Sequence, residues 1–378
     1  MRVVTCIEDL RQLAKKRVAR AIFDYVDCGS YSEYTLRANR ADLESLALRQ
    51  RVGIDVERRS TRVTMAGEEA TMPVALAPTG LTGLNWADGE ILAARAAERF
   101  GVPFTLSTMS ICSIEDVAGA VDKPFWFQLY VMRDRGFAAS LIERARQAKC
   151  SALVLTLDLQ IQGQRHRDLK NGLAVPPTLT LATAFDILRK PGWALNVLRG
   201  KRKSFGNLQG RIPDAKNLTT LSQWIAGQFD PTLSWKDVEW VKKLWGGRLI
   251  LKGILDAEDA KIAADSGVDA IVVSNHGGRQ LDGALSSIRA LPEIAEAVKE
   301  KTEVWFDGGI RSGQDVLKAL ALGAKATMIG RAFLYGLGAM GEAGVTRALE
   351  IIRAELDVTM ALCGLRDVKD ASPSILRA

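Results

Sequence analysis

The sequence predicts a (β/α)8 barrel, for three reasons. Eight short apolar runs rich in β-forming residues recur along the 378 residues. Most of them are continuous rather than alternating, as in parallel strands that are buried on both faces. Helical stretches lie between them, and eight strand–helix units in one chain are typical of this barrel. The runs are 73–78, 103–108, 125–130, 152–158, 248–253, 270–275, 303–309 and 326–331.

The segments between the runs support the same fold. Apolar residues recur at helical spacing in residues 89–100, 138–148, 257–267 and 314–323. A doubly wound sheet is the alternative, but its dinucleotide fingerprint G-x-G-x-x-G does not follow the first run. We therefore predict a single barrel domain over residues 1–378.

Two segments lie outside the repeating pattern. Residues 1–70 precede the first run and begin with an amphipathic helix rich in Lys and Arg, which we interpret as an N-terminal extension. Residues 159–247 separate the fourth and fifth runs, and an insertion of this length is usually functional. Within it, residues 185–206 hold six basic residues and one acidic residue among apolar side chains. This basic segment fits either a membrane-binding surface or a lid over the active site.

Composition narrows the class of protein. The chain is 47% hydrophobic and 25% charged, as in globular proteins with a sizeable core. Its five cysteines form no CxxC pair, which argues against disulfides and a cysteine metal site and fits a reducing cytoplasm. The net charge of +7 suits an anionic membrane or anionic small molecules. We expect no metal, no membrane-spanning helix and no nucleic-acid partner, because aromatic and basic residues interleave only in 185–206.

Polar side chains gather where the predicted strands end. The C-terminal ends of barrel strands meet on one face, which carries the active site of these folds. Buried polar groups there are costly unless they bind something, so their number predicts a site. The residues are Thr79, Ser107, Gln128, Tyr130, Thr156, Asp158, Lys252, Ser274, His276, Asp307, Gly330 and Arg331.

The last two runs end in phosphate-binding patterns. DGGIRSG at 307–313 and IGRAF at 329–333 combine glycines, an arginine and the start of a helix. Loops after strands 7 and 8 form the usual phosphate site of these barrels, and Arg311 and Arg331 supply cations. Tight turns with solvated arginines would explain either loop alone, but not both together.

One of only two histidines lies in SNHGGRQLDG, residues 274–283. We predict that His276 is an acid–base group and that Asp158 orients its imidazole. Arg165 and Arg279 are suited to hold a substrate carboxylate, although each taken alone could equally form a rim ion pair. Lys252 would place a positive charge in the mouth of the barrel, unless it is a structural lysine in a salt bridge.

These patterns together resemble a known family. QLYV (128–131), LTLD (155–158), GQRHRD (163–168), LKG (251–253), SNHGGRQLDG, DGGIRSG and IGRAF occur in order and at suitable spacing. The chain resembles the FMN-dependent α-hydroxy acid dehydrogenases and oxidases over about residues 5 to 370. Within that family it is most similar to the L-lactate dehydrogenases that use a quinone or a cytochrome.

The resemblance implies a role for each candidate residue. His276 takes the substrate proton, Asp158 stabilises the imidazolium, and Arg165 and Arg279 hold the carboxylate. Tyr25 and Tyr130 donate hydrogen bonds to the substrate. The residues implied to hold FMN are Ala77, Pro78, Thr79, Ser107, Gln128 and Thr156 at the ring, Lys252 at its pyrimidine end, Ser274 near the ribityl chain, and Asp307, Gly308, Gly309, Arg311, Gly330 and Arg331 at the ribityl chain and phosphate.

The implied reaction is the oxidation of an L-2-hydroxy acid, with L-lactate giving pyruvate. The resemblance also implies a homotetramer with peripheral contact to the inner face of the cell membrane. A soluble oxidase that forms peroxide and an (S)-mandelate dehydrogenase are the alternatives within the family. Another phosphate-binding barrel, such as a flavin-dependent isomerase, would lack the combination of His276, Arg165 and Arg279.

Overall fold

The computed structural model describes residues 3–172, 181–208 and 227–377. Eight parallel strands form one sheet in the order β4-β11-β10-β9-β8-β7-β6-β5. The sheet closes where Leu76, at the end of β4, pairs in parallel with Phe104, which immediately precedes β5. The predicted barrel is confirmed, and the doubly wound alternative is wrong. The strands are β4 (Val74–Leu76), β5 (Thr105–Ser107), β6 (Trp126–Leu129), β7 (Ala152–Thr156), β8 (Arg248–Ile254), β9 (Ala270–Val273), β10 (Glu303–Asp307) and β11 (Ala326–Ile329).

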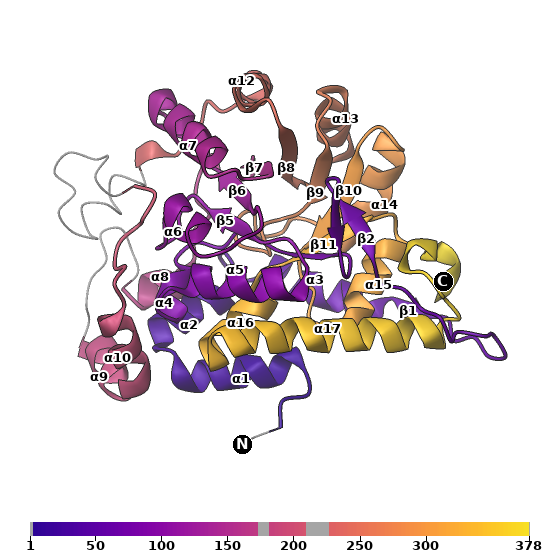
Figure 1. Cartoon of the computed structure of the whole chain (residues 1–378), viewed down its shortest axis with the longest axis horizontal. Coiled ribbons are helices and arrows are strands. Elements are labelled where there is room, and N and C mark those ends of the chain that lie inside the picture. The colour runs from indigo at the N-terminus through magenta and orange to yellow at the C-terminus, as the bar shows by residue number, and fades with distance from the viewer. Residues whose placement is uncertain (1–2, 173–180, 209–226, 378) are drawn as a thin grey trace.

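Helices surround this sheet (Figure 1). The four helices predicted from apolar spacing are all present, as α5, α7, α13 and α15. The long C-terminal helix α17 packs along α16, α15 and α5. The helices of the barrel layer and its C-terminal addition are α4 (Thr82–Asn85), α5 (Gly89–Phe100), α6 (Ile114–Ala118), α7 (Arg135–Gln147), α12 (Trp235–Trp245), α13 (Ala257–Asp265), α14 (Ser287–Val298), α15 (Gly313–Ala321), α16 (Arg331–Met340) and α17 (Glu342–Leu362).

The N-terminal ends of the strands are closed by side chains. Trp126 and Trp305 stack there with ring centroids 5.2 Å apart. The hairpin of β2 (Val63–Met65) and β3 (Glu68–Ala70) lies beside them, because Glu68 accepts a hydrogen bond of 3.0 Å from the Trp126 indole. Packing therefore fills this end, and the C-terminal ends are left for a site.

The predicted runs extend past several of the strands. The run 303–309 is an example, because β10 ends at Asp307. Gly308 and Gly309 follow with φ of +129° and +97°, which removes them from the strand geometry. Apolar or glycine-rich sequence marks the buried region correctly, whereas backbone dihedrals decide where pairing stops.

The N-terminal extension packs on the barrel. The predicted amphipathic helix is confirmed as α1 (Ile7–Arg17), which packs on α16. The extension continues through α2 (Arg20–Asp27), α3 (Tyr34–Ser45) and β1 (Ala47–Leu48), and β1 pairs with β12 (Leu376–Arg377). Two short 3-10 helices, η1 (Val368–Asp370) and η2 (Pro373–Ile375), precede β12.

The segment between β7 and β8 contains α8 (His166–Lys170), α9 (Leu181–Leu188), α10 (Pro191–Arg199) and α12. Within the predicted insertion 159–247, residues 173–180 and 209–226 lie outside the described residues. Helix α12 contacts α7 and β8, so it takes the place of the fourth barrel helix. Helices α9 and α10 contact each other and form a hairpin at the edge of the molecule (Figure 1).

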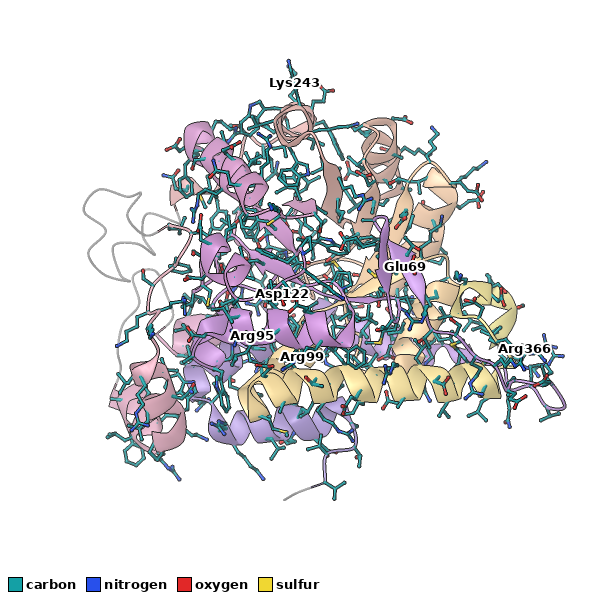
Figure 2. The ribbon with its side chains drawn as sticks, viewed as in Figure 1. Glu69, Arg95, Arg99, Asp122, Lys243 and Arg366 are labelled. Carbon is teal, nitrogen blue, oxygen red and sulfur yellow. The ribbon has the colours of Figure 1, made fainter. Side chains whose placement is uncertain are left out.

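Charged side chains of both signs are exposed on separate elements. Examples are Glu69 on β3, Arg95 on α5 and Lys243 on α12, all of which are exposed, and Lys243 projects from the outline of the molecule in Figure 2. Acidic groups are therefore interspersed with basic groups on the outer surface. None of the described helices is long and apolar enough to cross a membrane.

Candidate active site

A cavity of about 360 Å³ lies at the C-terminal ends of the strands. Side chains or backbone from the ends of β4, β5, β8, β10 and β11 line it, as expected for this fold. Most of the predicted residues meet here. Those lining the cavity are Tyr25, Ala77, Pro78, Thr79, Ser107, Tyr130, Arg165, Lys252, His276, Arg279, Asp307, Gly308, Gly309, Arg311, Gly330 and Arg331.

His276 is held in place from two sides. Its Nδ1 lies 2.9 Å from Asp158 Oδ1, and its backbone N–H donates to Ser274 Oγ at 3.1 Å. The close approach of Asp158 requires Gly253, because a Cβ at that position would lie 2.6 Å from the Asp158 Cγ. With Nδ1 engaged, Nε2 is the ring nitrogen left to exchange a proton with a substrate.

Two arginines flank the ring of Tyr25. The guanidinium carbon of Arg279 lies 4.9 Å from the ring centroid, and that of Arg165 lies 5.7 Å away. Arg279 donates to the backbone oxygens of Tyr25 and Cys28 at 2.6 and 3.0 Å, and within the described residues it forms no ion pair. Arg165 pairs with Asp168 at 3.3 Å. A bound carboxylate would supply the anionic partner that Arg279 lacks.

Tyr130 provides a further hydroxyl group in the lining of the cavity. Phe229 packs edge-on against its ring, with centroids 6.0 Å apart. Burial raises the pKa of the Tyr130 phenol far above its usual value, and the nearby Asp158 raises it further. The phenol therefore stays protonated at physiological pH and can donate a hydrogen bond to a substrate.

Lys252 is part of a buried polar triad. Its Nζ lies 2.7 Å from Asp307 Oδ2 and donates to Ser274 Oγ at 3.0 Å, while Ser274 donates to Asp307 at 2.8 Å. Burial opposes both charges, but their mutual attraction raises the pKa of Lys252 and lowers that of Asp307. The pair is therefore ionised, and Lys252 presents a fixed positive charge to the cavity.

Behind the cavity wall, each of two predicted ring contacts has one buried polar atom without a hydrogen-bond partner in the described residues. Gln128 pairs in register with Ser107, and Thr156 pairs in register with Lys252. Gln128 Oε1 accepts from Ser107 Oγ at 3.0 Å, but Gln128 Nε2 and Thr156 Oγ1 have no hydrogen-bond partner in the described residues. Buried polar atoms normally find a partner. A flat ring with carbonyl and N–H groups on one edge, such as the isoalloxazine of FMN, fits this arrangement.

The two glycine-rich loops bring cations together. Within the described residues, the guanidinium of Arg311 donates only to the neighbouring Ile310 carbonyl, at 2.7 Å. The guanidinium of Arg331 donates to three backbone carbonyls, at 2.8 to 2.9 Å. Neither forms an ion pair within the described residues. Burial lowers the pKa of Arg331 to about 10, and the charges of Arg279 and Arg311 contribute. This concentration of unneutralised positive charge fits the FMN phosphate.

Sequence reasoning missed several lining residues. Asp168, Gln162 and Leu159 follow β7, while Phe205 and Phe229 come from opposite sides of the undescribed stretch 209–226. Asp168 had a local signal, because it lies three residues after Arg165, one helical turn away. Phe205 belongs to the segment 185–206, for which a lid over the active site was one interpretation, whereas Phe229 had no signal in the sequence.

The sequence matches one family along almost its entire length. A family described as FMN-dependent dehydrogenase matches residues 14–378. An L-lactate dehydrogenase of Caulobacter sp. (strain K31) is 48% identical over 375 residues, which are 99% of this chain and 98% of that protein. Another, from Vibrio parahaemolyticus serotype O3:K6, is 46% identical, and the match covers 98% of each chain.

Solved structures of related proteins share the fold of this chain. The monotopic membrane protein (S)-mandelate dehydrogenase superposes with a TM-score of 0.94, at 36% identity over 100% of both chains. The fold is thus that of enzymes named L-lactate dehydrogenase and (S)-mandelate dehydrogenase.

Proposed function

The chain belongs to the FMN-dependent dehydrogenase family, and on that premise we propose that it oxidises L-lactate to pyruvate. The family makes it an FMN-dependent oxidoreductase that acts on CH–OH donors. L-lactate is proposed as the donor because relatives of that name are 46% to 48% identical along almost the full chain. We treat the chain as one catalytic unit, since Tyr25 and Arg331 line the same cavity.

The observation that most strongly supports this proposal is the unneutralised positive charge in the cavity. Arg279, Arg311 and Arg331 are each without an ion-pair partner among the described residues. Such a site favours anionic ligands at two places. We assign the FMN phosphate to Arg311 and Arg331, and the substrate carboxylate to Arg279 together with Arg165.

The remaining residues then have defined tasks. Arg165 and Arg279 orient the carboxylate, and the hydroxyl groups of Tyr25 and Tyr130 hydrogen-bond the substrate. His276 Nε2 accepts one of the two protons that the substrate loses, and Asp158 stabilises the resulting imidazolium through Nδ1. FMN, when bound, would supply the acceptor for the two electrons and the other proton of the oxidation. Lys252 would lie at its pyrimidine end, where a positive charge favours the reduced form.

A second donor, (S)-mandelate, is favoured by the apolar wall of the cavity. Met109, Leu159, Phe205 and Phe229 line it. This wall offers contact area to an aryl side chain that the methyl group of lactate does not use. Comparing kcat/KM for L-lactate and (S)-mandelate decides between the two donors.

For the electron acceptor we propose a membrane quinone or a cytochrome, reached from the cytoplasmic face of the membrane. The support is the α9–α10 hairpin, on which Phe185, Leu188, Leu195 and Leu198 are 50% to 78% exposed beside basic residues. Such a surface is suited to an anionic membrane interface. We also propose a homotetramer, which light scattering of the purified protein tests.

The first experiment is a visible spectrum of the purified protein, before and after anaerobic addition of L-lactate. Immediate bleaching of the flavin band supports the reaction and the donor. A band that bleaches only with mandelate or glycolate changes the donor. The absence of any flavin band, in protein also offered FMN, overturns the proposal. Slow return of the colour in air favours a dehydrogenase, and rapid return favours the peroxide-forming oxidase.

A further inference from the structure

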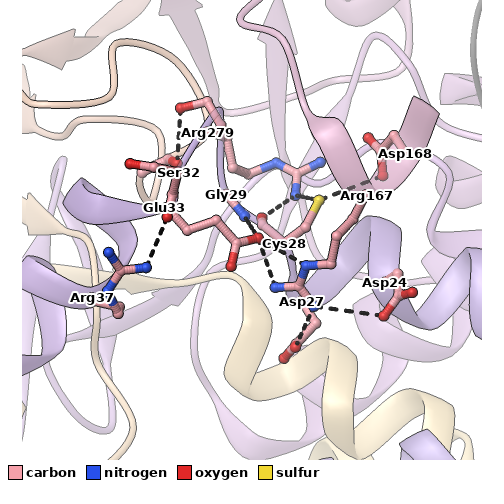
Figure 3. A network of polar contacts seen from close by, with 12 residues as sticks. Asp24, Asp27, Cys28, Gly29, Ser32, Glu33, Arg37, Arg167, Asp168 and Arg279 are labelled. Carbon is pink, nitrogen blue, oxygen red and sulfur yellow. Dashed lines mark hydrogen bonds and ion pairs between the residues drawn. The ribbon is translucent and has the colours of Figure 1, made fainter. Parts of the chain in front are cut away.

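Arg167 connects two segments that carry the proposed carboxylate site. It lies on α8 and reaches three carboxylates of the N-terminal extension (Figure 3). Its Nε donates to Glu33 Oε1 at 2.8 Å, and its Nη1 donates to Asp27 Oδ2 at 3.2 Å. The same Nη1 lies 3.6 Å from Asp24 Oδ1. Arg167 thereby fastens α8 to α2 and to the turn that follows it.

The position of α8 determines where Arg165 lies. Arg165 is the residue that immediately precedes the helix, and Asp168 within the helix pairs with it at 3.3 Å. The thiol of Cys28 donates to the other oxygen of Asp168 at 3.4 Å. Tyr25, whose ring Arg165 faces, belongs to α2. Arg167 therefore joins the two halves of the carboxylate site from outside the cavity.

Arg167 itself does not line the cavity, and its side chain is 34% exposed. An ion pair at this depth contributes little to the free energy of unfolding. Its removal would not leave Asp27 buried and unpaired, because Arg11 binds both oxygens of that carboxylate at 2.7 and 3.0 Å. Asn171 also retains its hydrogen bond of 2.8 Å to Asp24. Substitution of Arg167 should thus loosen α8 without unfolding the barrel.

We propose that Arg167 is a positioning residue that sets the affinity of the enzyme for the substrate carboxylate. It acts through α8, by holding Arg165 opposite Arg279 and Tyr25. The inference rests on the proposed function, because the anion concerned is the carboxylate of a 2-hydroxy acid.

The test compares the holoenzyme with its Arg167→Met variant. We expect KM for L-lactate to rise about tenfold, with kcat little changed, because ground-state and transition-state binding of the carboxylate weaken together. The dissociation constant of oxalate, an unreactive dicarboxylate, should rise by a similar factor when it is read from the flavin spectrum. FMN content should stay at the wild-type level.

Three further variants make the test specific. Arg20→Met removes an arginine whose side chain is 76% exposed and which lies 3.4 Å from the same Asp24, but it does not link α8, so KM should not change. Arg167→Lys retains a charge without the fork of donors and should recover part of the affinity. Glu33→Gln weakens one of the links and should give an intermediate KM.

The outcomes separate the two proposals. An unchanged KM and oxalate affinity in Arg167→Met, or a parallel loss of kcat and bound FMN, would overturn the positioning role. If L-lactate fails to bleach the wild-type flavin, the proposed donor is wrong. The oxalate titration then still decides the role of Arg167, because it needs only anion binding.

Discussion

His276 occupies a left-handed backbone conformation, with φ of +57°. Gly277 and Gly278 continue in the same region, at +65° and +72°, so the chain turns sharply at the end of β9. A glycine at position 276 would adopt this left-handed conformation without strain, but it would lack the imidazole. Strain of this kind persists at functional sites where the surroundings hold it. Here Asp158 and Ser274 hold the ring and the backbone of His276.

The ion pair of Lys252 with Asp307 gives a prediction for stability. We expect Lys252→Met to lower the free energy of unfolding at neutral pH by about 3–5 kcal/mol, because it leaves a buried carboxylate unpaired. Burial raises the pKa of Asp307, but the charge and hydrogen bond of Lys252 lower it further, below the usual value. Urea unfolding of the FMN-free proteins across a range of pH measures the difference.

The pH dependence follows from the sign of each shift. The stabilisation from Asp307 is present above its unfolded pKa of about 3.9 and is lost as pH falls through the lower, folded value. That from Lys252 is present below about 10.4 and is lost as pH rises through its higher, folded value. The deficit of Lys252→Met should therefore shrink in strong acid. The double variant with Asp307→Asn should regain stability at neutral pH, and a deficit that stays constant with pH would contradict this account.

At the scale of the elements, the α9–α10 hairpin has two faces. One face is exposed, and the other is attached to the wall of the cavity. Trp193 donates through its indole to the backbone oxygen of Leu84 at 2.9 Å, and Asn196 accepts from Ala87 at the same distance. Arg202 pairs with Asp88 and Asp116, both at 2.7 Å. Removing residues 185–206 would therefore disturb the cavity, and substitutions on the exposed face give a cleaner test of membrane binding.

We predict that Phe185→Ser, Leu188→Ser and Leu198→Ser, combined in one protein, abolish sedimentation with anionic phospholipid vesicles. These side chains are 61%, 78% and 66% exposed, and their burial in the interface would provide the binding energy. Bleaching of the flavin by L-lactate should be preserved. Ile262→Ser, on the remote helix α13 and 43% exposed, is the matched control. Sedimentation equal to that of the wild type would favour the interpretation of 185–206 as a lid.

At the scale of the whole molecule, the sequence predicted the barrel and most of the cavity for one physical reason. Parallel strands place their C-terminal ends on the same face, so the polar residues that end the apolar runs must converge. Tyr25 was different, since only the family resemblance indicated it. Phe229 was not predicted at all, and Phe205 was included only as part of the segment 185–206, for which a lid over the active site was one interpretation. Local periodicity reports that a residue is buried, but it does not report which distant segment covers it.

Anion binding should also stabilise the whole barrel, which gives a last prediction. Arg331 donates to the backbone oxygens of Val26, Cys28 and Gly277, and so ties α16 to α2 and to the loop after β9. Without an anion, burial lowers the pKa of Arg331, and the charges of Arg279 and Arg311 lower it further. A phosphate group bound there would offset the repulsion between these arginines. It would thereby stabilise α16, α2 and the loop after β9, which Arg331 joins.

We therefore expect FMN to raise the Tm of the FMN-free protein more than riboflavin does at equal ligand concentration. FMN at one hundred times its Kd should add about 2.7 kcal/mol to the free energy of unfolding at 25 °C. Riboflavin lacks the phosphate, so its Kd should be larger and its Tm shift smaller at equal concentration. Arg311→Met should reduce the difference between the Tm shifts caused by FMN and by riboflavin. It removes one of the two arginines assigned to the phosphate and leaves the ring contacts intact. Equal shifts from FMN and riboflavin would mean that the loops after β10 and β11 do not hold the phosphate. The charge that gathers at Arg311 and Arg331 would then need another ligand to neutralise it.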